Sequence, residues 1–361
     1  MHASSRRGFT LLELMVAMGI TAILVTMAVQ GAIMVDRGRR PRELLAQIQG
    51  EGRQGLGYLE ADLRAGSLGA GTGIIRTAIG GNPASRPAVQ IFENVGGGGF
   101  LDVKPGTDAV LVVRSAPSDG VRPALVGDVT TTTGALIVTD VGPFTAGAPV
   151  LAGEYEDAVW IPISTIDVDT KTLTSSLGAD VFPGKNAHKI NAGALVRPAR
   201  ARLYYVDAQD RLVRADLAVP RPPETAADVT ERVDIARNVE NLQVDCSVEQ
   251  GLALTACPAA IVGQDVTTEA VPALGEFPAG GGARLQAASG NNDVAALRTV
   301  SLSVVVRSRE LLGDPGPTDP RIQIQGVTLA PSGTGVNPNG LYMRRSYQLG
   351  VAVRNTSLGS L

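Results

Sequence analysis

The 361-residue sequence has few aromatic residues, and its net charge is small. Aromatic residues make up 4% of the chain, while 43 glycines and 22 prolines interrupt it, a composition that favours a loop-rich β protein over a helical bundle. A formal net charge of -3 provides neither a basic surface for bulk nucleic-acid binding nor a disordered acidic tail, so we predict no nucleic-acid partner. Hydrophobic residues make up 44%, which is enough for one large lobe or two smaller ones.

Histidines and cysteines are also scarce, and this excludes most metal sites and many enzyme classes. His188 is the only histidine beyond His2, and the chain has a single pair of cysteines, so we expect no metal site. The sequence contains no nucleophile elbow and no Cys/His pair, so we predict no catalytic residues, no cofactor and no enzyme activity. Asp167 and Asp169 could form a carboxylate pair or a calcium loop, but Asp-Val-Asp-Thr-Lys is more typical of a turn.

The two cysteines, Cys246 and Cys257, are separated by ten residues in a segment that has the pattern of strand, turn and polar loop. In an oxidising compartment a disulfide between them would stabilise the fold by about 2 to 3 kcal/mol in the chain-entropy model. The alternative is two unpaired thiols. We predict the Cys246–Cys257 disulfide on the condition that the chain is exported to the periplasm.

A long apolar segment follows a short basic start. Phe9 to Val35 contains one charged residue, Glu13, and as a helix with a rise of about 1.5 Å per residue it exceeds the roughly 30 Å of a bilayer's hydrocarbon core. A secretory signal carries its small-residue cleavage site after the apolar run, whereas Gly8 comes before this one. Cleavage after Gly8 would therefore remove the basic leader and keep the helix.

Glu13 needs a physical explanation, because an ionised carboxylate in a bilayer costs at least a few kcal/mol unless it is paired. Cleavage at Gly8 would create an α-amino group on Phe9, about 6 Å of axial rise from Glu13. A neighbouring subunit displaced by that distance would bring its Glu13 level with this amine and form an assembly contact. The alternative is a carboxylate that reaches the membrane surface near the helix end.

The segment Arg6-Arg7-Gly8-Phe9-Thr10-Leu11-Leu12-Glu13-Leu14-Met15-Val16-Ala17 resembles the prepilin-type motif of type IV pilins and type II secretion pseudopilins. The resemblance implies that a prepilin peptidase cleaves between Gly8 and Phe9, that the new Phe9 amine is methylated, and that Glu13 sets subunit register. It also implies an α+β, type IV pilin-like fold, in which a long N-terminal helix packs on an antiparallel β-sheet domain with long loops. The expected parts are a leader (1–8), a transmembrane half-helix (9–35), an amphipathic half-helix (36–66) and a β-rich domain (67–361).

The helix is expected to continue from Phe9 to Ala65 with an apolar stripe on its second half. The residues of that stripe recur at helical spacing: Leu45, Ile48, Gly52, Leu56, Leu59 and Leu63. Pro41 is expected to bend or locally open the helix, because proline lacks a backbone donor. Four glycines weaken the second half. They either let the stalk melt or, as we favour, allow it to pack closely on a sheet; they are Gly50, Gly52, Gly55 and Gly57.

Beyond the helix, apolar and β-branched runs between turn signals predict strands. The predicted strands are 108–114, 135–139, 158–163, 201–206, 212–217, 239–248, 299–308 and 342–354. In the run from Thr299 to Arg307, apolar residues alternate with partly polar ones, which is typical of a sheet with one wet face. Residues 66–99 are expected to form a glycine-rich loop, and residues 313–340 a long mobile one.

A second resemblance, to the PilW family of minor pilins, is carried by short blocks. They are Leu63-Arg64-Ala65-Gly66, Val239-Glu240-Asn241-Leu242-Gln243-Val244, Ala296-Leu297-Arg298-Thr299-Val300, Val306-Arg307-Ser308, Arg344-Arg345 and Val353-Arg354-Asn355. It implies a minor pilin that primes type IV pilus assembly, with the filament tip as a candidate location. The protein would cross the bacterial inner membrane once with its C-terminal domain in the periplasm, and then move to the filament.

The expected partners are other minor pilins, the major pilin, a prepilin peptidase and a tip adhesin. Two alternatives stay open. One is a minor pseudopilin of a type II secretion system similar to the J component, and the other is a binding or enzymatic domain that uses the helix only as an anchor.

Overall fold

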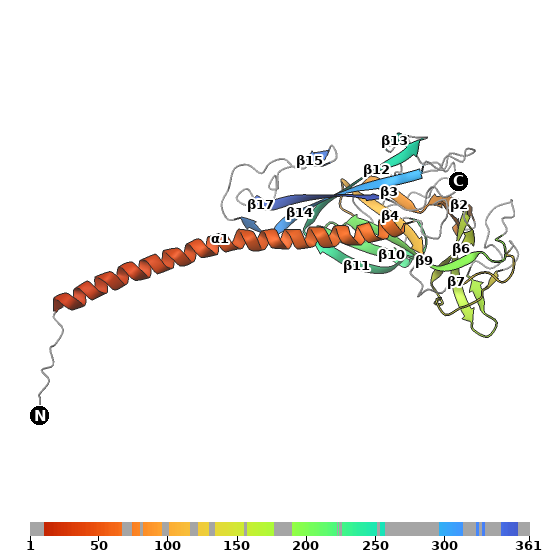
Figure 1. Cartoon of the computed structure of the whole chain (residues 1–361), viewed down its shortest axis with the longest axis horizontal. Coiled ribbons are helices and arrows are strands. Elements are labelled where there is room, and N and C mark those ends of the chain that lie inside the picture. Colours follow the sequence, from red (N-terminus) through yellow and green to blue (C-terminus); the bar gives the residue numbers. More distant parts are fainter. Residues whose placement is uncertain are drawn as a thin grey trace, which may run out of the picture.

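The computed structural model consists of a long helix followed by β-sheets (Figure 1). It describes residues 11–66, 74–79, 82–95, 101–115, 122–129, 134–154, 157–176, 190–221, 223, 226–250, 253–256, 296–312, 323–324, 327–328 and 341–352. The helices are α1 (Leu11–Ala65) and a 3-10 turn η1 (Ala226–Asp228). The strands are β1 (Ile74–Ile79), β2 (Asn82–Pro87), β3 (Val89–Val95), β4 (Thr107–Ser115), β5 (Ala135–Ile137), β6 (Pro149–Glu154), β7 (Asp157–Asp167), β8 (Thr172–Ser175), β9 (Leu195–Val206), β10 (Arg211–Leu217), β11 (Val229–Arg237), β12 (Val239–Gln250), β13 (Ala253–Ala256), β14 (Ala296–Leu312), β15 (Gln323–Ile324), β16 (Val327–Thr328) and β17 (Leu341–Ala352).

Helix α1 runs without interruption through Pro41 and curves gently along its length (Figure 1). Its first half stands clear of the β domain and its second half packs against it. The helix ends at Ala65, as the sequence predicts, because Gly66 begins a tight turn in which its N–H donates to the Leu63 carbonyl at 3.1 Å. A Cβ atom at Gly66 would lie 2.9 Å from that same oxygen, so the close turn requires glycine. The expected local opening at Pro41 is not observed.

The described strands form two main sheets and one short hairpin. The larger, 11-stranded sheet follows the order β11-β10-β9-β6-β7-β1-β2, with β4 also beside β9, β3 beside β4, and β8 joining β7 to β5. The smaller sheet has the order β13-β12-β14-β17, and β15 pairs with β16. Every described strand pair is antiparallel except β1 with β7. The predicted fold class, a long N-terminal apolar helix followed by antiparallel sheets, is confirmed.

Asn238 is the point at which the chain passes from one sheet to the other. It lies between β11 of the larger sheet and β12 of the smaller one, with φ at 57°. Asparagine tolerates this left-handed conformation better than most residues do. Its carbonyl accepts the N–H of Arg307 at 2.9 Å, and the next residue, Val239, donates to the Asp210 carbonyl at 2.8 Å. Backbone hydrogen bonds therefore hold the two sheets together at this crossing.

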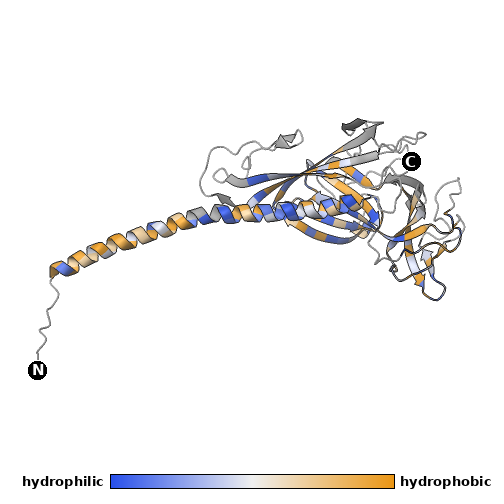
Figure 2. Ribbon diagram, in the orientation of Figure 1, coloured by the Kyte–Doolittle hydropathy of each residue, from blue (hydrophilic) through white to orange (hydrophobic). Residues whose placement is uncertain are grey.

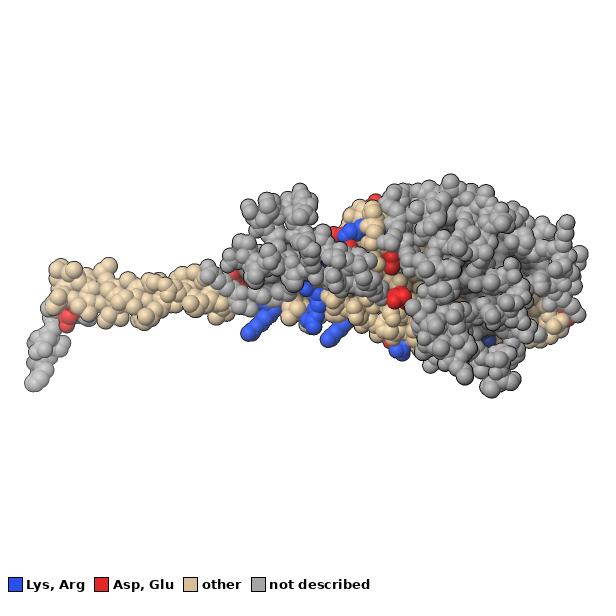
Figure 3. Space-filling view, turned by 90° about the horizontal axis from the view of Figure 1, so that it is seen from above, with Lys and Arg blue, Asp and Glu red and all other residues tan. Residues whose placement is uncertain are grey.

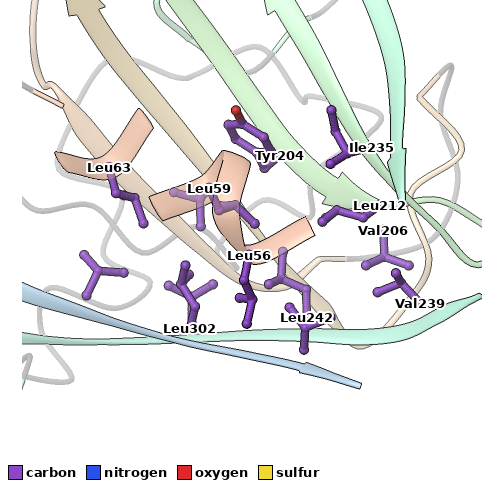
Figure 4. Close-up of a cluster of buried hydrophobic side chains, with 14 of the residues drawn as sticks. Leu56, Leu59, Leu63, Tyr204, Val206, Leu212, Ile235, Val239, Leu242 and Leu302 are labelled. Atoms are coloured by element: carbon purple, nitrogen blue, oxygen red, sulfur yellow. The ribbon is translucent and has the colours of Figure 1, made fainter. Parts of the chain in front are cut away.

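The second half of α1 fills the space between the two sheets (Figure 4). Leu59 and Leu63 are fully buried and Leu56 is nearly so, in one core with Tyr204 of β9 and Leu302 of β14. Ile48 and Gly52 are buried on the same face, and Leu45 is half-buried. The predicted apolar stripe is therefore confirmed.

A separate hydrophobic core lies in the part of the chain between β4 and β9. Its residues share no member with the core around α1; they are Leu125, Val129, Leu136, Val138, Val141, Phe144, Val150, Ala152, Val159, Ile161, Ile163, Leu173, Ile190, Ala194 and Val196. Strands β5, β6, β7 and β8 supply seven of these fifteen residues, and the segments around them supply the rest. In Figure 1, β6 and β7 lie at the end of the molecule opposite the N-terminus.

The eight predicted strands are present, but the predicted loop over 66–99 is wrong. The described residues in that range form β1, β2 and β3. Strand β2 has the sequence Asn-Pro-Ala-Ser-Arg-Pro, which lacks any alternation, and it is a strand because it pairs with β1 from Ile74↔Pro87 to Ile79↔Asn82. In the range 313–340, also predicted to be a loop, the described residues form the β15–β16 hairpin.

Candidate functional site

The first candidate site is the bare, apolar half of α1. The segment Leu11–Asp36 has 26 residues, and its most apolar stretch has a mean hydropathy of 2.2 and no buried residue (Figure 2). Leu11 is 78% exposed and Met34 is 73% exposed. A helix of this length and composition is sufficient to cross a hydrocarbon layer of about 30 Å. The segment therefore has the properties of a membrane-spanning helix.

Three polar side chains in this segment, those of Thr21, Thr26 and Glu13, are placed so that a helix in lipid tolerates them. The Thr21 hydroxyl donates to the Ala17 carbonyl and the Thr26 hydroxyl to the Ala22 carbonyl, each at 2.8 Å, so neither donor requires a water molecule. Glu13 lies in the first turn, where the partial positive charge of the helix N-terminus favours a carboxylate. Gly8 and Phe9 lie outside the described residues, so cleavage and methylation at that bond stay predictions.

The second half of α1 is fixed to the larger sheet by a buried carboxylate. Asp62 is 3% exposed, and both of its carboxylate oxygens accept hydrogen bonds from Arg202 Nη1 of β9, at 2.9 and 3.0 Å. Arg114 of β4 lies 3.2 Å away and the Tyr204 hydroxyl donates to the same carboxylate at 2.5 Å. Buried charges of this kind persist only when they are paired and hydrogen-bonded. Asp62 therefore determines how the end of α1 sits on the sheet.

Burial raises the pKa of Tyr204 far above its ordinary value, and the negative charge of Asp62 raises it further. Burial likewise raises the pKa of Tyr205 to about 12. Burial lowers the pKa of Arg114, although Asp62 opposes that shift. The phenol of Tyr204 therefore stays protonated and donates to Asp62 over the whole physiological pH range.

The helix also contacts strands at the edges of both sheets. The N–H of Arg237 in β11 donates to Glu51 Oε2 at 2.8 Å. A Cβ atom at Gly52 would lie 2.5 Å from the ring of Tyr347 in β17, and one at Gly55 would lie 2.9 Å from Leu212 in β10. Gly50 and Gly57 face open space. Close packing on the sheets, the favoured interpretation of the glycines, therefore explains Gly52 and Gly55 and leaves the other pair without a structural reason.

A second charge cluster joins the two sheets at the β9–β10 turn. Asp210 pairs with Lys104 at 2.5 Å and with Arg307 of β14 at 2.6 Å. Glu240 of β12 pairs with Arg344 of β17 at 2.6 Å. Ion pairs that link strands far apart in sequence hold the sheets in a fixed arrangement.

Of the other residues singled out from sequence, Cys246 is buried on β12, whereas Cys257 lies outside the described residues, so the disulfide stays a prediction. His188 also lies outside them. Asp167 is at the turn after β7, where its side chain accepts the N–H groups of Asp169 and Thr170 at 3.0 and 3.1 Å, which confirms the predicted turn. The described residues contain no group of three or more His, Cys, Asp or Glu suited to hold a metal ion.

Sequence reasoning missed the contacts that fix α1 to the sheets. Asp62 and Arg202 are 140 residues apart, and nothing in the local sequence of either indicates the other. The available signal for Asp62 was its position: a carboxylate adjacent to Leu63 and three residues after Leu59 lies beside the apolar stripe of the helix.

Comparison with known proteins supports an N-terminal processing motif. Residues 3–29 match the prokaryotic N-terminal methylation motif. The N-terminal part of the chain is therefore similar to that of proteins that carry this motif. The motif implies processing by a prepilin peptidase, and the motif together with the apolar helix suggests anchoring in the inner membrane. A type IV-like pilin from Thermus thermophilus aligns with 59% of this chain and 87% of its own, at 13% identity and a TM-score of 0.22. No curated protein matches the sequence.

Proposed function

We propose that the chain is a minor pilin of a type IV pilus, which primes filament assembly at the inner membrane and has the filament tip as its candidate location. One observation carries the proposal. A methylation motif over residues 3–29 begins a helix whose segment Leu11–Asp36 is apolar and exposed, and a much larger β domain is attached beyond it. The motif indicates processing, and the bare helix provides the surface by which subunits associate.

The proposed role of Glu13 follows from helix geometry. Glu13 lies four positions after Phe9, or about 6 Å of axial rise. If a neighbouring subunit is displaced by that amount, its carboxylate lies level with this subunit's N-terminal amine. The pair then neutralises two charges inside an apolar bundle, and any other register leaves them separated. Glu13 thereby selects the register of assembly.

The size of the β domain supports a role in few copies rather than as the repeating body of the filament. Two sheets surround the second half of α1, and a region with its own hydrophobic core extends the domain further. A thin filament built from many such subunits would pack poorly. The proposed partners are therefore other minor pilins, the major pilin and a tip adhesin.

Substitution of Glu13 tests the mechanism. Glu13→Gln retains the size of the side chain and removes its charge, while Glu13→Asp serves as the control that keeps the charge. We expect Glu13→Gln to abolish surface pili and cross-linking to other pilins, with membrane insertion and processing of the chain unchanged. Normal pili from cells that carry only Glu13→Gln would show that the register contact does not exist.

Mass spectrometry of the protein from native membranes tests processing directly. We expect a chain that begins at Phe9 with a methylated amine, and a Cys246–Cys257 linkage that disappears on reduction. An intact Met1 on the functional pool would contradict the filament assignment, because the amine that pairs with Glu13 would not exist.

A minor pseudopilin of a type II secretion system is the second candidate, because the matched residues 3–29 lie in the part of the chain that both classes share. The deletion strain distinguishes the two. Loss of twitching and surface pili supports the pilus, whereas loss of secreted enzymes with normal twitching supports the secretion filament. A domain that retains its role after replacement of the motif by an unrelated anchor would instead be a tethered binding or enzymatic domain.

A further inference from the structure

Four arginines follow the apolar segment directly. The segment ends at Asp36, and the next six residues are Arg-Gly-Arg-Arg-Pro-Arg. All of them are in α1, whose backbone continues without a break into the half that packs on the sheets. We refer to Arg37, Arg39, Arg40 and Arg42 as the arginine belt.

The belt is not part of the β domain. Arg39 and Arg42 are exposed, and the first fully buried residue along α1 is Ile48. Figure 3 shows Lys and Arg side chains gathered beside the point where the bare apolar stalk meets the rest of the molecule. The arginines therefore lie between the end of the apolar segment and the start of the packed domain.

The local charge is positive even after nearby acids are included. Asp36 and Glu43 flank the belt, and Arg39 Nε lies 2.6 Å from Glu43 Oε1. Both side chains of this pair are largely exposed, at 74% and 59%. An exposed pair of this kind is worth little and exchanges readily for another anion. Residues 36–43 thus contain four arginines and two acids, a formal charge of +2 at this level of the helix.

The length of the helix places the belt in the headgroup layer. The 26 residues of Leu11–Asp36 span about 39 Å at a rise of roughly 1.5 Å per residue, compared with about 30 Å of hydrocarbon. A centred segment therefore extends a few ångströms beyond the hydrocarbon on each side. The backbone of residues 37–42 covers the next turns, at the level of the headgroup phosphates, and an arginine near a helix end can keep its charged group in that layer.

We propose that the arginine belt is a binding site for the phosphate headgroups of anionic phospholipids, on the side of the membrane where the β domain stands. The proposal rests on the membrane-spanning part of the proposed function and is independent of filament assembly. Guanidinium groups form forked hydrogen bonds with phosphate oxygens, which suits them to this ligand. A subunit that leaves the membrane must exchange these lipids for other anions.

Lipid retention by the full chain in nanodiscs tests the proposal. The nanodiscs contain equal amounts of phosphatidylglycerol and phosphatidylcholine, and native mass spectrometry of the released protein counts the bound lipids. The variant carries Arg37→Gln, Arg39→Gln, Arg40→Gln and Arg42→Gln. Since each basic residue near the surface changes anionic lipid affinity by roughly fivefold at low salt, we expect the excess of phosphatidylglycerol to fall at least tenfold in the variant.

The matched control removes the same number of charges from exposed arginines outside the belt: Arg53→Gln, Arg64→Gln, Arg200→Gln and Arg237→Gln. We expect it to retain phosphatidylglycerol like the wild type. The basic leader is present in every version, so its contribution cancels. High salt should reduce the wild-type excess, because screening weakens exposed charges.

Three results would overturn the proposal: equal retention by the wild type and the belt variant, an equal loss in the control, or no preference between the two lipids in the wild type. If lipid retention is unchanged but assembly of pili is lost in the belt variant, the belt contacts another subunit instead. Failure of the chain to enter nanodiscs at all would contradict the membrane-spanning assignment itself. Co-purification of the chain with the nanodisc measures this entry separately from lipid retention.

Discussion

At the scale of single residues, Asp62 holds the end of α1 against the larger sheet. Its carboxylate is 3% exposed and contacts Arg202, Arg114 and Tyr204. Removing one partner of a buried ion pair leaves the other buried and uncompensated, at a cost of about 3 to 5 kcal/mol. We therefore expect Asp62→Ala to lower the free energy of unfolding by that amount. Chemical denaturation of the full chain in detergent, followed through the fluorescence of buried Trp160, measures it.

Glu60→Gln is the matched control for this substitution. Glu60 is two residues away on the same helix and pairs with exposed Arg64. Because surface pairs contribute about 0 to 1 kcal/mol, the control should unfold almost like the wild type. Equal effects of the two substitutions would mean that Asp62 has no special role.

The raised pKa of Tyr204 predicts that the folded protein loses stability at alkaline pH. Its pKa in the folded state is raised above the ordinary value of 10.0, first by burial and then by Asp62. Above pH 10 the phenol of Tyr204 loses its proton in the unfolded chain and keeps it in the folded chain. The folded state therefore binds more protons, and stability falls as pH rises. Below pH 10 the contribution is fully present. Each such tyrosine contributes a slope of about 1.4 kcal/mol per pH unit.

Denaturation between pH 8 and pH 11.5 measures that slope. Tyr205, whose pKa burial raises to about 12, adds a second group of the same sign. We expect Tyr204→Phe to make the slope above pH 10 shallower by about one proton, although the variant is less stable at pH 8 because Asp62 loses a donor. A slope identical to that of the wild type would show that Tyr204 titrates normally.

At the scale of elements, the glycines of α1 predict opposite effects of the same substitution. Gly52→Ala places a methyl group 2.5 Å from ring atoms of Tyr347, so the ring or the helix must move, and overpacking of this kind costs about 1 to 3 kcal/mol. Gly57→Ala meets nothing within 4 Å and should stabilise the helix by about 0.5 to 1 kcal/mol. Thermal unfolding of the two variants should move in opposite directions. A shift of the same sign for both would contradict the close approach of α1 to β17.

The periodicity of the sequence predicted most of the helices and strands, but it did not predict which strand pairs with which. The stripe from Ile48 to Leu63 and the eight strand runs were predicted, because burial of one face leaves a repeat in the sequence. Strand β2 was missed because it is a strand through pairing alone. In β14, the alternation from Thr299 to Arg307 predicted a wet face, but Ser303 and Val305 on that face are buried. The sequence of a strand does not show what packs over its two faces.

At the scale of the whole molecule, one part of the candidate site was predictable from the sequence and another part was not. The processing motif at residues 3–29 was recognisable because it is local. The attachment of α1 through Asp62 was not, because its partners come from strands more than 50 residues later in the sequence. Local sequence thus predicts how the chain is processed and inserted, whereas the orientation of the β domain on the helix depends on tertiary contacts.

The region between β4 and β9 is expected to open independently of the rest. Its core has no residue in common with the core around α1, so a cavity there leaves the packing of β12 and β14 intact. Leu173 is fully buried in this region, and Leu173→Ala should cost about 2 to 5 kcal/mol locally. Hydrogen exchange of the full chain should then rise in peptides from 134–154 and 157–176, and stay unchanged in those from 296–312.

Leu302→Ala provides the reciprocal control, since Leu302 is fully buried beside α1. It should raise exchange in α1, β12 and β14, because the helix and both strands share that core. If each substitution affects only its own core, the region between β4 and β9 and the core around α1 are separate cooperative units, and the one opposite the N-terminus can change without disturbing the helix. Exchange that rises everywhere after Leu173→Ala would mean that the domain unfolds as a single unit.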